Sequence, residues 1–251
     1  MSNHISNGEF YVKKKDKSDT SSFKLFKTIL FKDLKSEVRQ IHDLISILLF
    51  DIISIFIFSS AYNVSTQEQN MTSEIFVIEI WVIIFFTLIF LMAKLFIKEK
   101  ESGTLNGILS APVSPNIIFM SKILFGFLLL SLIEVVLMLF GFLLSNPSGI
   151  ILNVPIWLFF LVAILLPTLD LCITGTLVSA FSMYAKNKSF ILPVLLFPIL
   201  LPIASPIISM NVKLLQGLFF ADILMEFFFL IFHVILMFSI LILVSDILLT
   251  E

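Results

Sequence analysis

Six long apolar runs, separated by short polar gaps, occupy this chain of 251 residues from about position 41 to its end. Each run is close to the roughly 20 residues that an α-helix needs to cross the hydrocarbon core of a bilayer. The expected spans are 41–61, 75–97, 117–144, 154–181, 190–210 and 224–249. The sequence therefore predicts an all-α, polytopic membrane protein whose six-span domain covers residues 41–251.

The composition agrees with this class and excludes others. Hydrophobic residues make up 59% of the chain and charged residues only 14%, so a soluble domain of this length would expose a large apolar surface. A single cysteine, Cys172, excludes a disulfide within the chain and any cysteine-based metal cluster. We predict no metal site.

The distribution of cations predicts the orientation. All but one of the 16 Lys and Arg residues precede the first span or lie at the second-to-third and fourth-to-fifth connections, and the exception is Lys213. Loops rich in Lys and Arg stay on the cytoplasmic side of a membrane. We therefore expect a plasma or inner membrane protein with both termini in the cytoplasm.

The segment before the first span divides into two parts. Residues 1–21 are polar and lysine-rich, which predicts a disordered cytoplasmic tail. In residues 22–40, apolar positions such as Phe23, Phe26 and Leu30 recur at three- and four-residue steps, which predicts an amphipathic helix at the membrane interface. A cytosolic helix packed on a partner protein is the alternative.

The connection between the second and third spans is the most informative polar stretch. An amphipathic run is followed by prolines, which cannot continue a helix, so we expect a short helix that ends there. Such an element can dock a cytoplasmic partner, although an ordinary surface loop is the alternative. The candidate docking residues are Glu99, Glu101, Ser102, Gly103, Thr104, Leu105, Leu109 and Pro112.

Several pieces of the sequence, in order, resemble one family. They are Ile80-Trp81-Val82, Leu95-Phe96, Glu99, Glu101, Gly103-Thr104-Leu105, Leu109, Pro112, Lys122, Pro167-Thr168-Leu169 and the lysine-bearing link at 184–189 that leads into a proline-rich span. Together these pieces resemble the cytochrome c maturation protein B (CcmB) family, the permease subunit of haem-export type ABC transporters, over roughly residues 30–210. The part around Gly103-Thr104-Leu105 also resembles the wider ABC-2 type permeases. Asp170 departs from the pattern, because a small or apolar residue is expected there.

The resemblance implies a six-span permease that lacks its own ATPase. A separate ATP-binding subunit would bind ATP and dock on the 99–115 connection, and other cytochrome c maturation membrane subunits would be partners in the same bilayer. A homodimer, or a heterodimer with another permease, is also implied as possible. Haem would be a transported or handled ligand that this chain does not bind tightly. No nucleic-acid partner is expected.

Two other functions remain open from the sequence. An ABC-2 type permease for another hydrophobic or lipid-linked substrate would share most of these features. An integral membrane enzyme is disfavoured, because no cluster of acids, histidines or metal ligands gathers at one membrane face. The P-loop, H-E-x-x-H and G-x-S-x-G patterns do not occur in the sequence either, so we predict no catalytic residue.

Four ionisable side chains fall inside the predicted spans, where charge is costly. They are Asp51, Glu134, Asp170 and His233, with Asp170 placed toward the cytoplasmic side and His233 in the outer half. Such groups can form a polar pathway or a conformational latch, or simply hydrogen-bond between helices. His233 could also ligate haem iron, although a lone histidine in an apolar stretch is a weak indication.

Two spans carry features that affect helix packing. Gly175 and Ser179 form a small-xxx-small pair, which allows close approach of a neighbouring helix. Pro193, Pro198, Pro202 and Pro206 lie within one span, which predicts a kinked or broken helix that lines the interior or the outer rim.

Overall fold

The computed structural model describes the chain apart from residues 1–8, 69, 111–112, 149–153, 219 and 251. The described part confirms the all-α prediction: it is 89% helical and contains no strand. Its only extended pairing is an isolated bridge between Thr72 and Ser148.

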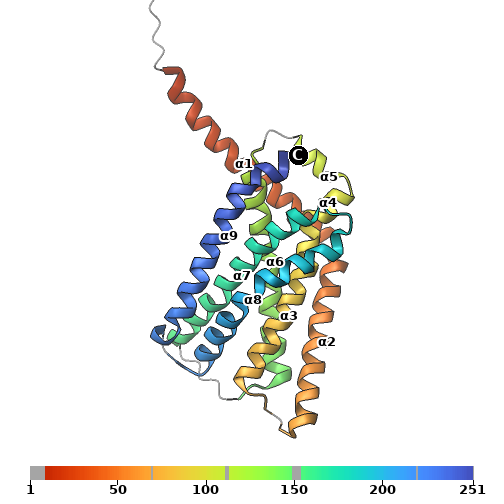
Figure 1. The fold of residues 1–251 in the computed structure, drawn as a ribbon, viewed down its shortest axis with the longest axis vertical. Helices are drawn as coiled ribbons and strands as arrows, with labels where there is room; N and C mark the ends of the chain where they lie inside the picture. Colours follow the sequence, from red (N-terminus) through yellow and green to blue (C-terminus); the bar gives the residue numbers. More distant parts are fainter. Residues whose placement is uncertain (1–8, 69, 111–112, 149–153, 219, 251) are drawn as a thin grey trace, which may run out of the picture.

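Six long helices form the body of the molecule (Figure 1), and all six are long and apolar enough to cross a membrane. This confirms the predicted number of spans. They are α2 (Ile41–Thr66), α3 (Ser73–Leu95), α6 (Pro115–Ser145), α7 (Val154–Ser182), α8 (Lys188–Leu215) and α9 (Leu224–Thr250). A 3-10 turn, η1 (Phe220–Ile223), precedes α9.

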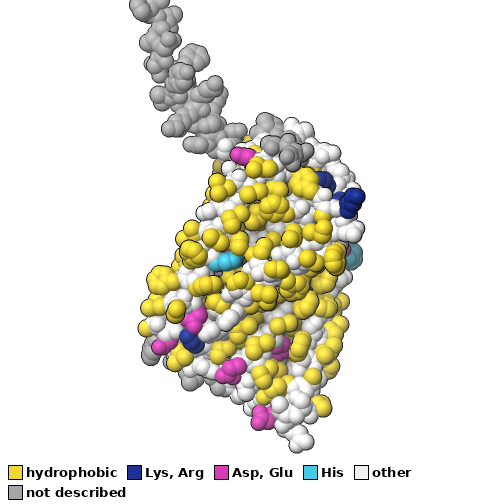
Figure 2. Space-filling model, in the orientation of Figure 1, with side chains coloured by type: hydrophobic (Ala, Val, Ile, Leu, Met, Phe, Trp, Pro, Cys, Tyr) yellow, Lys and Arg dark blue, Asp and Glu magenta, His cyan; other side chains and the backbone are white. Residues whose placement is uncertain are grey.

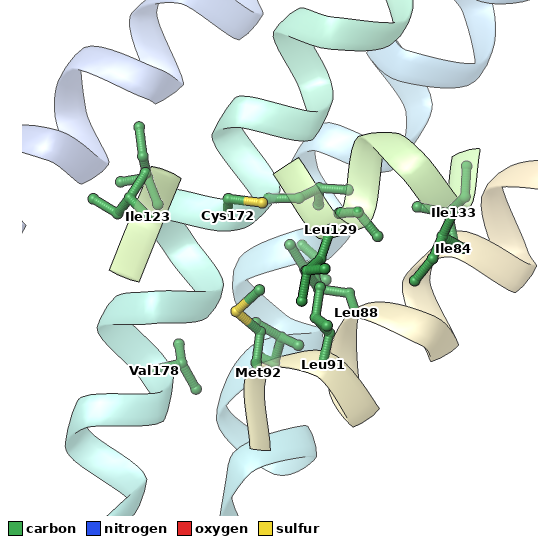
Figure 3. Packing of buried hydrophobic residues seen from close by; sticks show 14 of the residues in the cluster. Ile84, Leu88, Leu91, Met92, Ile123, Leu129, Ile133, Cys172 and Val178 are labelled. Atoms are coloured by element: carbon green, nitrogen blue, oxygen red, sulfur yellow. The ribbon is translucent and has the colours of Figure 1, made fainter. Parts of the chain in front are cut away.

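The core lies where α3, α6 and α7 meet, while α2 and α9 flank the bundle (Figure 1). Figure 3 shows Leu88 and Met92 of α3 facing Leu129 of α6 and Cys172 of α7. The outer surface is also apolar: Figure 2 shows a face covered mainly by hydrophobic side chains, with charged groups gathered toward its two ends. A bundle that is apolar inside and outside is what a lipid solvent requires.

The small residues of α7 lie against α3. Ser179 Oγ donates a hydrogen bond to the Met92 carbonyl over 2.7 Å. A Cβ atom added at Gly175 would lie 2.5 Å from Met92 Cγ, so only glycine fits without a shift of that side chain. Close approach of α3 and α7 therefore depends on the pair that the sequence indicates.

Of the two forms that the sequence predicts for the proline-rich span, kinked or broken, the structure excludes the broken one. Helix α8 runs without interruption from Lys188 to Leu215, and Pro198 and Pro202 are exposed on its outer side, so they do not line the interior. Residues four apart share one helix face, so the rings at Pro198, Pro202 and Pro206 avoid the packed side of α8. In α7, Pro167 frees the Ala163 carbonyl, which accepts a hydrogen bond from Asn211 Nδ2 of α8 at 3.2 Å.

The N-terminal helix α1 (Glu9–Arg39) lies across one end of the bundle (Figure 1). It begins at Glu9, within the segment that the sequence analysis expects to be a disordered tail. Residues 9–21 contain no Pro or Gly and include helix-favouring Lys and Glu, so nothing in them stops the helix. Ile29 and Leu30 are buried against the bundle, whereas Phe23, Phe31 and Val38 are exposed.

The two ends of the bundle differ in charge. One end, here called the lysine-rich end, carries α1, the connection between α3 and α6, and the C-terminus of α9. At the opposite end the connections touch one another: Asn146 Nδ2 donates to Asn70 Oδ1 over 2.6 Å, and Gln216 bonds to Glu74. Lys213 lies there and pairs with Glu226 at 2.6 Å.

Candidate functional site

The connection between α3 and α6 consists of two short helices, α4 (Ile97–Glu101) and α5 (Thr104–Leu109), where the sequence predicted one. Gly103 separates them because its φ of 72° lies in the left-handed region, which glycine adopts without steric cost. The Thr104 hydroxyl donates to the Glu99 carbonyl over 3.2 Å and steadies the turn. Pro115 opens α6, whereas Pro112 and the side chain of Leu109 lie outside the described residues.

The candidate docking residues of this connection divide into two groups. Glu101, Ser102, Gly103 and Thr104 are exposed. Leu105 is only 3% exposed and belongs to the packed core, so it cannot contact a partner directly. The apolar side of α5 therefore anchors the connection to the bundle, and its polar side faces outward.

Four charged side chains join this connection to α1 and α6. We call Lys32, Asp33, Glu99 and Lys122 the charged clasp. Lys122 Nζ lies 2.7 Å from Glu99 Oε1 and 2.9 Å from Asp33 Oδ2, and its side chain is 2% exposed. Lys32 Nζ lies 2.8 Å from the same Glu99 oxygen and 3.0 Å from Asp33 Oδ1. The clasp thus holds three separate elements at one point.

The clasp is electrostatically balanced, with two cations and two carboxylates. Burial opposes the charge of Lys32, but the hydrogen bond and charge of Glu99, together with Asp33, raise the pKa of Lys32 above its ordinary value. Removing one partner of such a group is costly, because the remaining buried charge loses its compensation.

Further ion pairs surround the clasp. Lys94 Nζ of α3 lies 2.7 Å from Glu37 of α1, and Lys98 of α4 lies 3.1 Å from Asp43 at the start of α2. A cavity of about 610 Å³ opens between α1, α4, α5 and α6. Glu99 lies in its wall, and Glu99 Oε2 is buried without a hydrogen-bond partner among the described residues.

The connection also touches the other half of the bundle. The ammonium of Lys100 lies 3.6 Å from the centre of the Tyr184 ring, and Lys188 Nζ is 3.9 Å from Glu101. The Tyr184 hydroxyl in turn donates to the Leu248 carbonyl near the end of α9. A displacement of α4 would therefore also disturb the contacts of α6, of the α7–α8 link and of α9.

Sequence reasoning missed three members of this network. The sequence analysis uses Lys122 as a cation and as part of the family resemblance, without a partner, and it does not distinguish Asp33 and Glu37 from the polar face of the N-terminal helix. A signal was present, because Ile29, Asp33 and Glu37 follow one another at four-residue steps. Acids on an otherwise buried helix face indicate a partner cation.

Inside the bundle, each predicted polar residue has a partner. Thr87 donates to Asp51 over 2.6 Å, and Thr168 donates to Glu134 over 2.7 Å. His233 Nδ1 lies 2.8 Å from Asp170 Oδ2, so these two side chains share one depth. The sequence placed them toward opposite sides of the membrane, whereas the structure brings them into contact because α9 packs alongside α7.

A further buried acid escaped the sequence analysis. Glu79 of α3 is 3% exposed and accepts a hydrogen bond from Ser145 Oγ over 3.0 Å. It lies near the opposite end of the bundle and joins α3 to the end of α6. Within the described residues, no group of three His, Cys, Asp or Glu side chains is arranged to hold a metal ion.

These features define a multi-pass membrane protein with six apolar helices and an anchored polar connection between the second and third. The sequence pattern of the family described as CcmB protein matches residues 24–243, so the chain belongs to that family. This confirms the resemblance seen in the sequence. No curated protein matches the chain. The chain is accordingly a membrane transport component of the haem-export system in cytochrome c maturation.

The clasp predicts unequal roles for its two lysines. Replacing the buried Lys122 by Met should lower the free energy of unfolding by about 3 kcal/mol, because two carboxylates lose their nearest cation. Lys32→Met, at a side chain that is 45% exposed, should cost less than about 1 kcal/mol. Denaturant unfolding of the purified protein in detergent measures both. Equal losses would contradict the assignment of Lys122 as the centre of the clasp.

Proposed function

We propose that this chain is the permease subunit of an ABC transporter complex that exports or delivers haem for the maturation of c-type cytochromes. A separate ATP-binding subunit hydrolyses ATP and docks on α4 and α5. The observation that carries this proposal is the charged clasp, which fixes an otherwise exposed connection to the ends of α1 and α6.

The lysine-rich end faces the cytoplasm in this proposal, together with both termini. Its support is the positive-inside rule, since that end carries α1 and Lys94, Lys98, Lys100, Lys122 and Lys188, while Lys213 lies at the opposite end. The membrane is then the plasma or inner membrane of the cell. Exposed Phe23 and Phe31 of α1, next to Lys24 and Lys27, suit a helix lying among lipid headgroups.

The docking surface consists of the exposed residues between the two short helices and on the outer side of α5. Glu101, Ser102, Thr104 and Asn106 present polar groups there, and Leu105 holds the segment from below.

Movement would pass from the ATPase to the spans through the clasp. Glu99 is on α4 and Lys122 is on the first turns of α6, so α4 cannot shift without moving α6 or separating a buried ion pair. Separation would cost several kcal/mol, and joint movement is therefore favoured. Membrane subunits of the maturation system, or a second permease chain, would complete the path along which haem is handled.

The orientation is tested by reporter fusions. Reporters that are active only outside should work after Asn70, Pro147 and Lys213, whereas reporters that are active only in the cytoplasm should work after Gly107 and Lys186. The physical reason is the cost of moving lysine-rich connections across the membrane. Each position is fused to both reporters, so every site carries its own control. Two or more reversed sites would refute the orientation.

The docking surface is tested by placing a bulky side chain on it. Asn106→Trp should weaken co-purification of the ATPase subunit at least tenfold, which corresponds to about 1.4 kcal/mol, because the indole would hold the two surfaces apart. Ser65→Trp, at an exposed position of the opposite end, is the matched control and should leave binding unchanged. Leu105→Asp is unsuitable, because it would disrupt the packing of α5. Equal binding by both Trp variants would exclude this surface.

A further inference from the structure

The pair formed by His233 of α9 and Asp170 of α7 is the most chemically specific feature within the spans. Both carboxylate oxygens lie within 2.9 Å of His233 Nδ1. The Asp170 side chain is fully buried, and that of His233 is 9% exposed. The carboxylate therefore fixes the imidazole ring in one orientation, with Nε2 directed away from it.

The second ring nitrogen of His233, Nε2, has no such hydrogen-bond partner within the described part of the chain. No side chain or backbone group among the described residues hydrogen-bonds to His233 Nε2, and this atom is not among the fully enclosed polar atoms of the bundle. A histidine that donates one N–H to a carboxylate and leaves its other nitrogen free has the arrangement of a metal ligand, because the carboxylate orients the ring and makes it more basic.

The surroundings of Nε2 suit an apolar ligand that arrives from the bilayer. One turn to either side of His233, Phe229 and Leu236 are exposed, whereas Leu230 and Met237 on the other flank are buried. His233 therefore lies on the border between the packed face of α9 and its lipid-facing face. A flat apolar macrocycle can approach that border along the exposed residues.

Charge selects the oxidation state of such a ligand. The carboxylate of Asp170, when ionised, places one negative charge inside the membrane, where charge is costly. The core of a ferric porphyrin carries one positive charge and offsets it, whereas a ferrous porphyrin core is neutral. Coordination forms one Fe–Nε2 bond, displaces a weakly held ligand of the iron and transfers no electron.

We propose that His233 Nε2 is an axial ligand for ferric haem at the α7–α9 face, and that Asp170 is its positioning residue. The identity of the ligand rests on the proposed haem-handling function. Because the site is a border on the lipid-facing surface, the ligand exchanges readily, as suits a molecule that is passed on.

The test is a titration of the full chain, purified in lipid nanodiscs, with ferric haem. The wild type should give the absorption and electron-paramagnetic-resonance signature of histidine-ligated ferric haem. His233→Gln should lose it with at least tenfold weaker binding, although its amide can still donate to Asp170 and so keep the helices joined. His42→Ala, at an exposed histidine at the lysine-rich end, is the matched control and should bind as the wild type does.

The role of Asp170 has its own readout. Asp170→Asn retains an acceptor for Nδ1 but removes the charge, so ferric affinity should fall about tenfold or more while ferrous affinity stays nearly constant. A wild-type protein without the histidine-ligated spectrum, an unchanged spectrum in His233→Gln, or equal ferric and ferrous effects in Asp170→Asn would overturn the proposal. Co-purification of the ATPase is measured on the same samples. If the wild type binds the ATPase but does not ligate haem, this inference alone fails. If the wild type does not bind the ATPase, the proposed function fails.

Discussion

The buried ammonium of Lys122 is the constraint on which the arrangement of the lysine-rich end depends. An ion removed from water loses several kcal/mol of hydration, so it must be surrounded by compensating charge. Asp33 and Glu99 provide that charge from two different elements, and Lys32 balances the second carboxylate. The positions of α1 and α4 therefore follow from the position of one side chain on α6.

Within the bundle, packing and hydrogen bonds hold the helices together in place of ion pairs. Lipid gives helices no hydrophobic reason to associate, so close contacts and hydrogen bonds must hold them together. Gly175 allows α3 and α7 to approach, and Ser179, Thr87 and Thr168 supply hydroxyl groups to backbone or carboxylate acceptors on neighbouring helices. At the His233–Asp170 pair, Nδ1 faces the carboxylate while Nε2 has no protein partner among the described residues.

The sequence predicts the features that depend on local pattern. Span number follows from apolar length, the charge asymmetry of the two ends follows from lysine positions, and family membership follows from ordered motifs. Contacts between residues far apart in the chain cannot be predicted from local pattern. His233 and Asp170 are 63 residues apart, and nothing in either segment specifies how α9 is placed against α7. The same applies to Lys122, because whether a lysine at a helix end is exposed depends on what folds over it.

Local detail also depends on tertiary context. The turn at Gly103 divides the predicted docking helix into two. Leu105 is buried in the core although its neighbours in sequence are exposed. Four prolines lie inside α8, and the helix nevertheless continues from Lys188 to Leu215. Propensity alone cannot decide these outcomes, since it does not include the neighbours.

A double-mutant cycle on Lys122 and Glu99 is the most direct test of the claim that the clasp joins α4 to α6. Lys122→Met, Glu99→Gln and the double variant are compared for the free energy of unfolding and for stimulation of the partner ATPase. Our account predicts that the double variant loses less than the sum of the single variants, with a coupling energy of about 1 kcal/mol or more. Additivity within about 0.5 kcal/mol, with ATPase stimulation intact in every variant, would contradict it.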